Sequence, residues 1–233
     1  MEGWKVGRLV KSQPSSPPIF QHTVTILQPD FYNRPTLIVA RDLLGQRLVR
    51  ELDGQRVSGL IVETEAYSGP DDSASHAYLK RNSGRAGVMF GPPGRSYVYF
   101  IYGMYFMLNI VTEAEDFPAA VLIRAIEPQE GVELMHTNRF SPHPLPAASP
   151  LRVPSPPRLT NGPAKLCQAL KIDRKLNNWD LTLGQALWLE SAPAVPADAI
   201  ATGPRVGIDY AQPEDRTAPW RFWLRGNKFV SKP

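Results

Sequence analysis

The sequence is short of cysteine and of long apolar runs, and each shortage excludes a class of protein. Cys167 is the only cysteine among 233 residues, which excludes an intrachain disulfide framework and any zinc or iron–sulfur site built from clustered cysteines. A single thiol also suits a reducing compartment. No run of about 18 apolar residues exists, so we expect no membrane span. Lys5 and Arg8 are followed by no apolar region, so we predict no signal peptide.

Several catalytic motifs are missing as well. The chain has no G-x-x-x-x-G-K-[ST] phosphate loop, no G-x-G-x-x-G, no H-E-x-x-H and no G-x-S-x-G elbow. These absences argue against nucleotide hydrolysis, dinucleotide redox chemistry, zinc proteolysis and ordinary serine hydrolysis. The four histidines lack the spacing of metal ligands, so we predict no metal site; they are His22, His76, His136 and His143.

Proline is abundant and unevenly spread. The chain has 24 prolines, and seven of them lie in residues 141–157, where neither a helix nor a central strand is compatible with them. We predict a proline-rich surface loop there. Residues 1–20 have the composition of a flexible N-terminal segment. Residues 21–233 are then predicted to form a single domain, because no linker or internal repeat divides them.

Charge is patterned along the chain, whose formal net charge is +4. Acidic residues gather between 51 and 75, and basic residues gather between 78 and 95 and again between 136 and 174. One interpretation is a set of ordinary solvated faces. The other is a surface that contacts phosphates around a site that needs a carboxylate.

The first half of the chain predicts a helix followed by a hairpin. Pro35 suits the first turn of a helix that runs to about Leu44. The segments Gln46–Leu52 and Gln55–Tyr67 read as strands, because Asp53-Gly54 between them is a strong hairpin signal.

The second half predicts further strands and one helix. Residues 97–112 are aromatic and β-branched and read as two strands that reverse near Tyr102-Gly103, although a helix starting after Gly103 is also compatible. Residues 119–126 are a further strand, and Asn161 is expected to cap a helix that continues through Leu170. We expect an α+β single domain with a curved, largely antiparallel sheet, flanking helices and a protruding aromatic hairpin. Late strands are predicted at Leu187–Glu190, Arg205–Asp209 and Arg221–Leu224.

One predicted strand carries two carboxylates and a phenol at its end. Alternate residues of a strand share a face, so Glu63, Glu65 and Tyr67 point one way. This pattern is typical of an active-site rim, and it also fits an edge strand with a solvated acidic face. The residues expected on the other face are Val62, Thr64 and Ala66.

A histidine and a group of tyrosines flank that strand in sequence. His76 follows nine residues after Tyr67 and is able to fold back over the same site, although a lone loop histidine is often incidental. Aromatic residues in a strand usually pack in a core. A turn tip at Tyr102-Gly103-Met104 would instead present a flat aromatic group that stacks on a base or wedges between base pairs. The four phenols are Tyr97, Tyr99, Tyr102 and Tyr105.

Taken in order, these segments resemble the alkyladenine (3-methyladenine) DNA glycosylase family, of the type that includes the mammalian enzyme. The resemblance covers about residues 29–227, and many ordered motifs carry it rather than one short pattern. The matching stretches are Glu63-Thr64-Glu65-Ala66-Tyr67, Gly69-Pro70-x-Asp72, Ser75-His76, Met89-Phe90-Gly91-Pro92-Pro93-Gly94, Tyr97-Val98-Tyr99-x-Ile101-Tyr102-Gly103-Met104, Asn109, Leu122-Ile123-Arg124-Ala125-x-Glu127-Pro128, Gly162-Pro163-x-Lys165-Leu166-Cys167-Gln168-Ala169 and Gly203-Pro204-Arg205-Val206-Gly207-Ile208.

The resemblance implies base-excision repair of double-stranded DNA. The enzyme would flip an alkylated or deaminated purine out of the duplex and hydrolyse its N-glycosidic bond with a carboxylate-activated water. The lesion class would be 3-methyladenine, 7-methylguanine, hypoxanthine and ethenoadenine. A water nucleophile leaves no Schiff base, so we expect a monofunctional glycosylase without a lyase step. We also expect no cofactor, a monomer, and a location with DNA in the cytoplasm, nucleoid or nucleus.

The resemblance also implies roles for individual residues. By the family pattern, Glu65 activates the water, Arg124 helps to hold it, and the Ile208 carbonyl contacts it. The residues implied to contact the flipped purine are Tyr67, His76 and Tyr99, with Asn109 crowding the amine of guanine; those implied to contact DNA are Tyr102, which fills the vacated place, its neighbour Met104, and Lys165 on the backbone.

The chain departs from the family pattern at residues 80–88, where Arg85-Ala86-Gly87-Val88 stands in place of the usual Arg-Asn before the Met-Phe motif. Two other classes of function remain open at this point. One is a protein that binds lesions without excising them, and the other is a hydrolase of free nucleosides.

Overall fold

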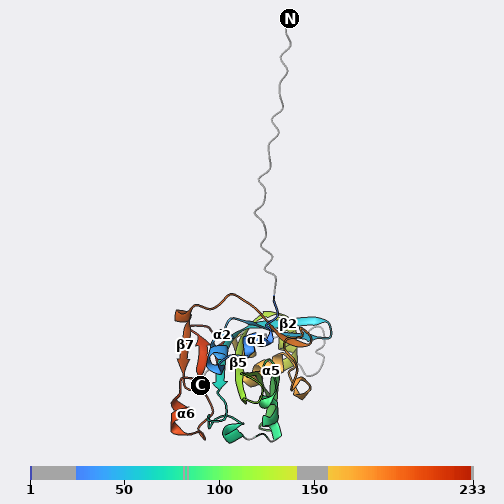
Figure 1. Cartoon of the computed structure of the whole chain (residues 1–233). Helices are drawn as coiled ribbons and strands as arrows, with labels where there is room; N and C mark the ends of the chain where they lie inside the picture. Colours follow the sequence, from blue (N-terminus) through green and yellow to red (C-terminus); the bar gives the residue numbers. More distant parts are fainter. Residues whose placement is uncertain (2–24, 81, 83, 141–156, 232–233) are drawn as a thin grey trace.

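An antiparallel sheet organises the computed structural model (Figure 1). Eight strands of the described residues belong to it. Six follow the order β3-β4-β5-β2-β1-β6, while β8 pairs with both β2 and β7. The strands are β1 Arg47–Leu52, β2 Gln55–Tyr67, β3 Ser96–Ile101, β4 Tyr105–Thr112, β5 Ala119–Glu130, β6 Leu187–Glu190, β7 Ile200–Gly203 and β8 Arg221–Leu224. The structure describes residue 1, residues 25–80, residue 82, residues 84–140 and residues 157–231.

Short helices flank the sheet and close its main hydrophobic core. Helix α2 packs on β2 and β5, while α5 packs on β4 and β5. Leu43, Ile123 and Leu166 are fully buried in the core between these elements. The α-helices are α1 Pro29–Tyr32, α2 Thr36–Asp42, α3 Val132–Phe140, α4 Pro157–Thr160, α5 Pro163–Ala169 and α6 Pro213–Thr217; the 3₁₀ turns are Tyr78–Lys80, Gly84–Phe90, Arg174–Leu176 and Ala197–Ala199.

Both predicted hairpins are confirmed. Asp53 and Gly54 have φ values of 50° and 76°, and Leu52 pairs with Gln55 across the turn. Tyr102 and Gly103 have φ values of 54° and 69°. Two successive left-handed residues make the tight turn whose twist matches antiparallel strands, which is why the chain reverses here without a loop. The strand β4 that follows excludes a helix after Gly103.

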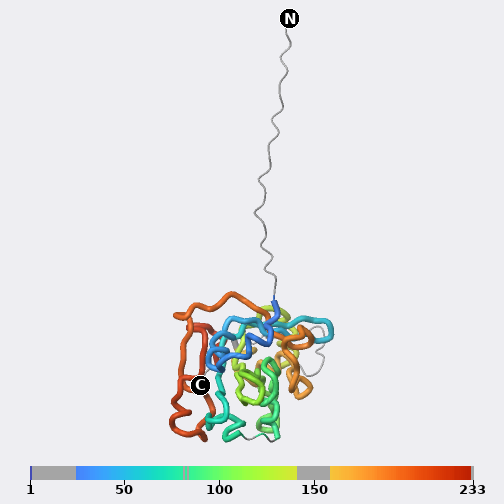
Figure 2. Tube along the Cα trace, viewed as in Figure 1, coloured from blue at the N-terminus to red at the C-terminus, as the bar shows by residue number. Residues whose placement is uncertain are grey.

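Strand β2 lies inside the sheet and is therefore not a solvated edge. Over residues 63–65 it pairs with β5 on one side and with β8 on the other. Figure 2 shows that the C-terminal segment, in orange and red, runs along one side of the molecule. Glu63 and Glu65 consequently have no exposed surface, so the interpretation of a solvated acidic face was wrong.

Two local predictions were wrong. Asn161 does not cap α5: the N-cap position is Gly162, and no side chain caps this helix. Residues 205–209 form no strand, because Pro204 lacks an N–H for pairing and Gly207 has a φ of 78°. The strand that pairs with β8 is instead β7, which ends at Gly203.

Some expectations fall beyond what the structure describes. The N-terminal segment 1–20, apart from residue 1, lies outside the described residues, and so do residues 141–156 of the proline-rich stretch. In the described ranges, no helix has both the length and the apolar character needed to cross a membrane.

Candidate active site

Two buried carboxylates on β2 share one guanidinium from β5. Arg124 donates from Nε to Glu63 Oε1 at 2.7 Å, and its Nη1 lies 3.1 Å from Glu65 Oε1. Thr64, between the two glutamates, donates to the Ala40 carbonyl of α2. The predicted alternation along β2 therefore holds for these three residues. A bulge in the pairing accompanies Val62, which lies in a small cluster with Phe229 rather than in the main core.

Besides Arg124, two further residues hold Glu65 in place. Its Oε1 accepts the Val206 N–H at 2.7 Å, and its Oε2 accepts the Tyr67 hydroxyl at 3.0 Å. Burial raises the pKa of Glu65, while Arg124 and the two hydrogen bonds oppose that rise. The carboxylate is thus desolvated and oriented, which is the environment of a general base.

A wide cleft opens above this carboxylate. Its volume is about 670 Å³, and Tyr67, Arg124 and Val206, all of which contact Glu65, line it. A smaller space of about 30 Å³ adjoins it and shares Tyr67 and His76 with it. That inner space has room for about one or two water molecules. A planar base must therefore occupy the wide cleft or displace the walls of the inner space.

The walls of the inner space are mostly aromatic. His76 Nδ1 lies 2.8 Å from the Tyr97 hydroxyl, and its ring meets that of Tyr99 edge-on at 4.6 Å between centroids. Burial, with the Arg85 charge, lowers the pKa of His76 to about 4, so its ring is neutral at pH 7. Burial also raises the pKa values of Tyr97 and Tyr99. Every group on this wall is therefore uncharged, as suits a nucleobase.

Asn109 closes the floor of the inner space from β4. It is 3% exposed and donates from Nδ2 to the Tyr97 carbonyl at 3.1 Å. Ile208 lines the wide cleft from the loop after β7 and packs with Ala74 and Tyr67. The structure thus brings Arg124, the predicted water contact Ile208 and the four residues predicted to face the base to one pair of adjoining spaces, next to Glu65: Tyr67, His76, Tyr99 and Asn109.

The β3–β4 hairpin carries exposed side chains, and its turn residue Tyr102 lines the cleft. Tyr102, at the turn, is 80% exposed and Met104 is 61% exposed. Tyr97, two positions before Tyr99 on β3, is by contrast buried. The tyrosines of this segment therefore divide between core and surface, and the one at the turn is on the surface.

Lys165 belongs to a basic cluster on α3, α4 and α5. Its Nζ donates to Asn161 Oδ1 at 2.8 Å, and burial together with Arg139 and Arg158 lowers its pKa. Pro163, at the start of the same helix, lines the cleft. The helix that carries Lys165 therefore begins at the cleft.

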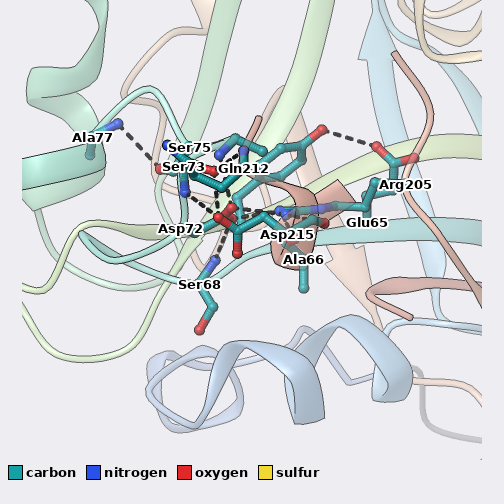
Figure 3. A network of polar contacts seen from close by, with 12 residues as sticks. Glu65, Ala66, Ser68, Asp72, Ser73, Ser75, Ala77, Arg205, Gln212 and Asp215 are labelled. Atoms are coloured by element: carbon teal, nitrogen blue, oxygen red, sulfur yellow. Dashed lines mark hydrogen bonds and ion pairs between the residues drawn. The ribbon is translucent and has the colours of Figure 1, made fainter. Parts of the chain in front are cut away.

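Sequence reasoning assigned no role to a buried ion pair between Arg205 and Asp72 (Figure 3). Arg205 binds Asp72 through both terminal nitrogens, at 2.5 and 2.8 Å, and donates to the Ala66 carbonyl. Its guanidinium also lies 4.8 Å from the centroids of the Tyr67 and Trp220 rings. Both charged residues occur in the quoted motifs. They are 133 residues apart in sequence, and only the folded chain shows that they are in contact.

The same network of hydrogen bonds holds the loop after β2 in place. Asp215 accepts the Ser73 N–H at 2.9 Å and the Ser73 hydroxyl, and the Gln212 N–H donates to that hydroxyl (Figure 3). This loop carries His76. The Arg205–Asp72 pair and its neighbours therefore fix both Tyr67 and the segment that supplies His76.

No group of three or more potential metal-ligating side chains occurs in the part of the chain that the structure describes. The assembled chemistry is that of a carboxylate and a guanidinium beside an uncharged aromatic space, with an exposed aromatic hairpin nearby. Such a combination is compatible with an enzyme that hydrolyses N-glycosyl bonds of bases presented by DNA, as the family resemblance implies.

Comparison with known proteins identifies the family. A family model described as methylpurine-DNA glycosylase matches residues 30–228. The chain belongs to the methylpurine-DNA glycosylase family and is a DNA-repair hydrolase of N-glycosyl bonds in DNA. The interpretation as a binding protein without enzymatic activity is therefore wrong.

Curated relatives extend over nearly the same length. A protein of Desulfitobacterium hafniense, provisionally named 3-methyladenine DNA glycosylase, is 51% identical over 206 residues, which cover 87% of this chain and 96% of the relative. Relatives with the same provisional name are 50% identical in Methanocella arvoryzae, covering 89% and 96%, and 45% identical in Alkaliphilus oremlandii, covering 88% and 98%.

Proposed function

We propose that residues 21–233 form a monomeric glycosylase domain that releases alkylated and deaminated purines from double-stranded DNA. The lesions are of the 3-methyladenine, 7-methylguanine, hypoxanthine and ethenoadenine class. The observation that carries this proposal is the contact of Glu65 with Arg124, Tyr67 and Val206, all three of which line one cleft. The enzyme acts in the compartment that holds the cell's DNA.

In the proposed mechanism, Glu65 takes a proton from a water molecule in the cleft. Arg124 and the Ile208 carbonyl help to hold this water. As the N-glycosidic bond breaks, the sugar develops oxocarbenium character, which a nearby carboxylate stabilises. The water oxygen then bonds to the anomeric carbon and the purine leaves with the bonding electron pair. Because no enzyme–sugar bond forms, the DNA strand stays intact.

Recognition of the base is assigned to the aromatic walls. Tyr67, Tyr99 and neutral His76 stack on or contact the flipped purine. A damaged or weakly paired purine leaves the duplex at lower cost. Asn109 crowds the exocyclic amine of guanine, so Asn109→Ser should release undamaged guanine above background. Tyr102 fills the vacated place in the duplex, with its neighbour Met104 beside it, while Lys165 contacts the backbone.

The experiment is excision from duplexes that each carry one defined lesion, with the free modified nucleoside as a parallel substrate. We expect base release from the duplex, an abasic strand that breaks only after alkali, and little release from the nucleoside. Glu65→Gln should bind the lesion duplex and release no base. Release at the wild-type rate by that variant would remove the role of Glu65, and preference for the nucleoside would favour a nucleoside hydrolase.

A further inference from the structure

Glu63 is a buried charge that does not line the cleft. It has no exposed surface and accepts four hydrogen bonds. Leaving a carboxylate in a protein interior is costly unless partners compensate it. The donors are Arg124 Nε at 2.7 Å, Arg221 Nε at 2.8 Å, and the N–H and hydroxyl of Ser231 at 2.6 and 2.8 Å.

Arg221 balances the charges of this cluster, which holds two glutamates and Arg124. Glu63 and Glu65 both lie against Arg124, so one positive charge would serve two negative ones. Arg221, which faces Glu65 across the β2–β8 pairing, supplies Glu63 with a further positive charge. The four groups together are electrically balanced, and the charge of Arg124 remains available to Glu65.

The cluster also fixes the direction of the Arg124 side chain. Its Nε is bound to Glu63 and its Nη2 donates to the Ser231 hydroxyl at 3.1 Å, which leaves Nη1 on Glu65. Arg221 in turn donates to the Ser231 carbonyl at 3.0 Å and lies against the Trp223 ring. A planar guanidinium held at two nitrogens has one orientation left, so the third nitrogen is aimed.

We propose that Glu63 and Arg221 are positioning residues for the glycosylase reaction: Glu63 aims Arg124 at Glu65, and Arg221 neutralises Glu63 so that Arg124 stabilises the ionised Glu65. This inference rests on the proposed role of Glu65 as the base that activates water. The charged and titratable groups that face Glu65 are Glu63 and Tyr67 on β2, Tyr99 on β3, Arg124 on β5, Arg221 on β8, and Arg205 and Tyr210 in the segment after β7.

Removing the charge of Glu63 and removing the charge of Arg221 should shift the pH dependence of excision in opposite directions. The reaction needs ionised Glu65, so excision falls as pH drops through the pKa of Glu65. Glu63 raises that pKa, so Glu63→Gln, whose amide oxygen still accepts from Arg124, should shift the acidic limb of the pH–rate profile to lower pH. Arg221→Gln leaves Glu63 uncompensated beside Arg124 and should shift this limb to higher pH.

A third variant separates position from charge. Glu63→Ala removes the acceptor that aims Arg124, so excision should fall by about 10- to 100-fold even at high pH. Glu63→Gln should restore most of this loss. Arg221→Lys keeps the charge and should keep the limb within a few tenths of a unit of wild type. Arg56→Gln is the matched control, because Arg56, at the other end of β2, also binds two glutamates, Glu130 of β5 and Glu190 of β6.

The test measures two quantities on each full-length variant. One is the pH dependence of single-turnover hypoxanthine excision, and the other is the ¹³C titration of the Glu65 carboxyl, identified by its loss in Glu65→Gln. Opposite shifts for Glu63→Gln and Arg221→Gln support the inference. Shifts in the same direction, or no larger than those of Arg56→Gln, overturn it. The carboxyl titration reports on the cluster even if no excision occurs, in which case only the proposed function fails.

Discussion

Replacing Tyr102 distinguishes a role of this side chain in flipping a base from a role in stabilising the fold. The side chain is 80% exposed, and the residue sits at a φ of 54° in the turn between β3 and β4. Truncating a fully buried aromatic residue costs about 3–5 kcal/mol. Only about a fifth of this side chain is covered, so Tyr102→Ala should cost roughly 1 kcal/mol or less, which corresponds to about 2–4 °C in melting temperature.

The left-handed backbone at Tyr102 suggests a second variant, Tyr102→Gly, which should change stability less. A left-handed conformation at a residue with a side chain costs roughly 1–2 kcal/mol, which glycine avoids, while glycine loses about 0.5–1 kcal/mol through the entropy of the unfolded chain. Tyr102→Gly should therefore be as stable as the wild type to within about 1 kcal/mol. It nonetheless removes the whole side chain that is proposed to enter the duplex.

The loss should appear in base flipping. An unfilled gap in the duplex costs a few kcal/mol of stacking, so the flipped population should fall by about 10- to 100-fold. Fluorescence of a flipped ethenoadenine reports this population, and the deficit should shrink when the lesion is mispaired. Tyr102→Phe keeps the ring and should behave like the wild type. If Tyr102→Ala lowered the melting temperature by more than about 10 °C and left flipping unchanged, the proposed insertion of Tyr102 into the duplex would be refuted.

Three further changes test other parts of the site. Asp72→Ala leaves Arg205 buried without its carboxylate and should lower the free energy of unfolding by about 3–5 kcal/mol in denaturant titrations; wild-type stability would contradict the structural role of this pair. His76 has a pKa of about 4 against an ordinary 6.5, so the unfolded chain binds the extra proton and stability falls as pH drops between these values. At pH 5 the penalty should be roughly 2 kcal/mol, and thermal melts of His76→Gln should lack it. Lys165→Ala should weaken DNA binding across sequences and reduce the salt slope of log Kd by about one unit, whereas an unchanged slope would place this lysine off the DNA path.

The sequence by itself determined the local elements whose signals are short-range. Asp53-Gly54 and Tyr102-Gly103 predicted both hairpins, because left-handed turns depend on the residues within them. Alternation along β2 predicted that Glu63 and Glu65 share a side, as their common partner Arg124 confirms. The ordered motifs also indicated the family, which the family model confirms. These motifs lie on nearly every element that lines the cleft.

Where local signals were weak, prediction from the sequence was wrong. Asn161 is a frequent capping residue type, yet its side chain accepts a hydrogen bond from Lys165 instead. Residues 205–209 have an apolar alternation, but the strand that β8 needs is supplied by Ile200–Gly203. For Asn161 the competing partner is local, four residues further on in α5. For β8 the partner lies on a different segment from the one expected, because strand pairing depends on which segment the fold brings near.

The tertiary structure alone decided what surrounds the carboxylates. Two acidic residues on a strand are compatible with a solvated face or with a buried site, and the choice depends on β5 and β8 closing on both sides of β2. The arginines that pair with Glu63 and Asp72 come from 61 to 158 residues away in sequence. Burial and charge compensation are properties of groups that meet only after folding, so no local pattern encodes them.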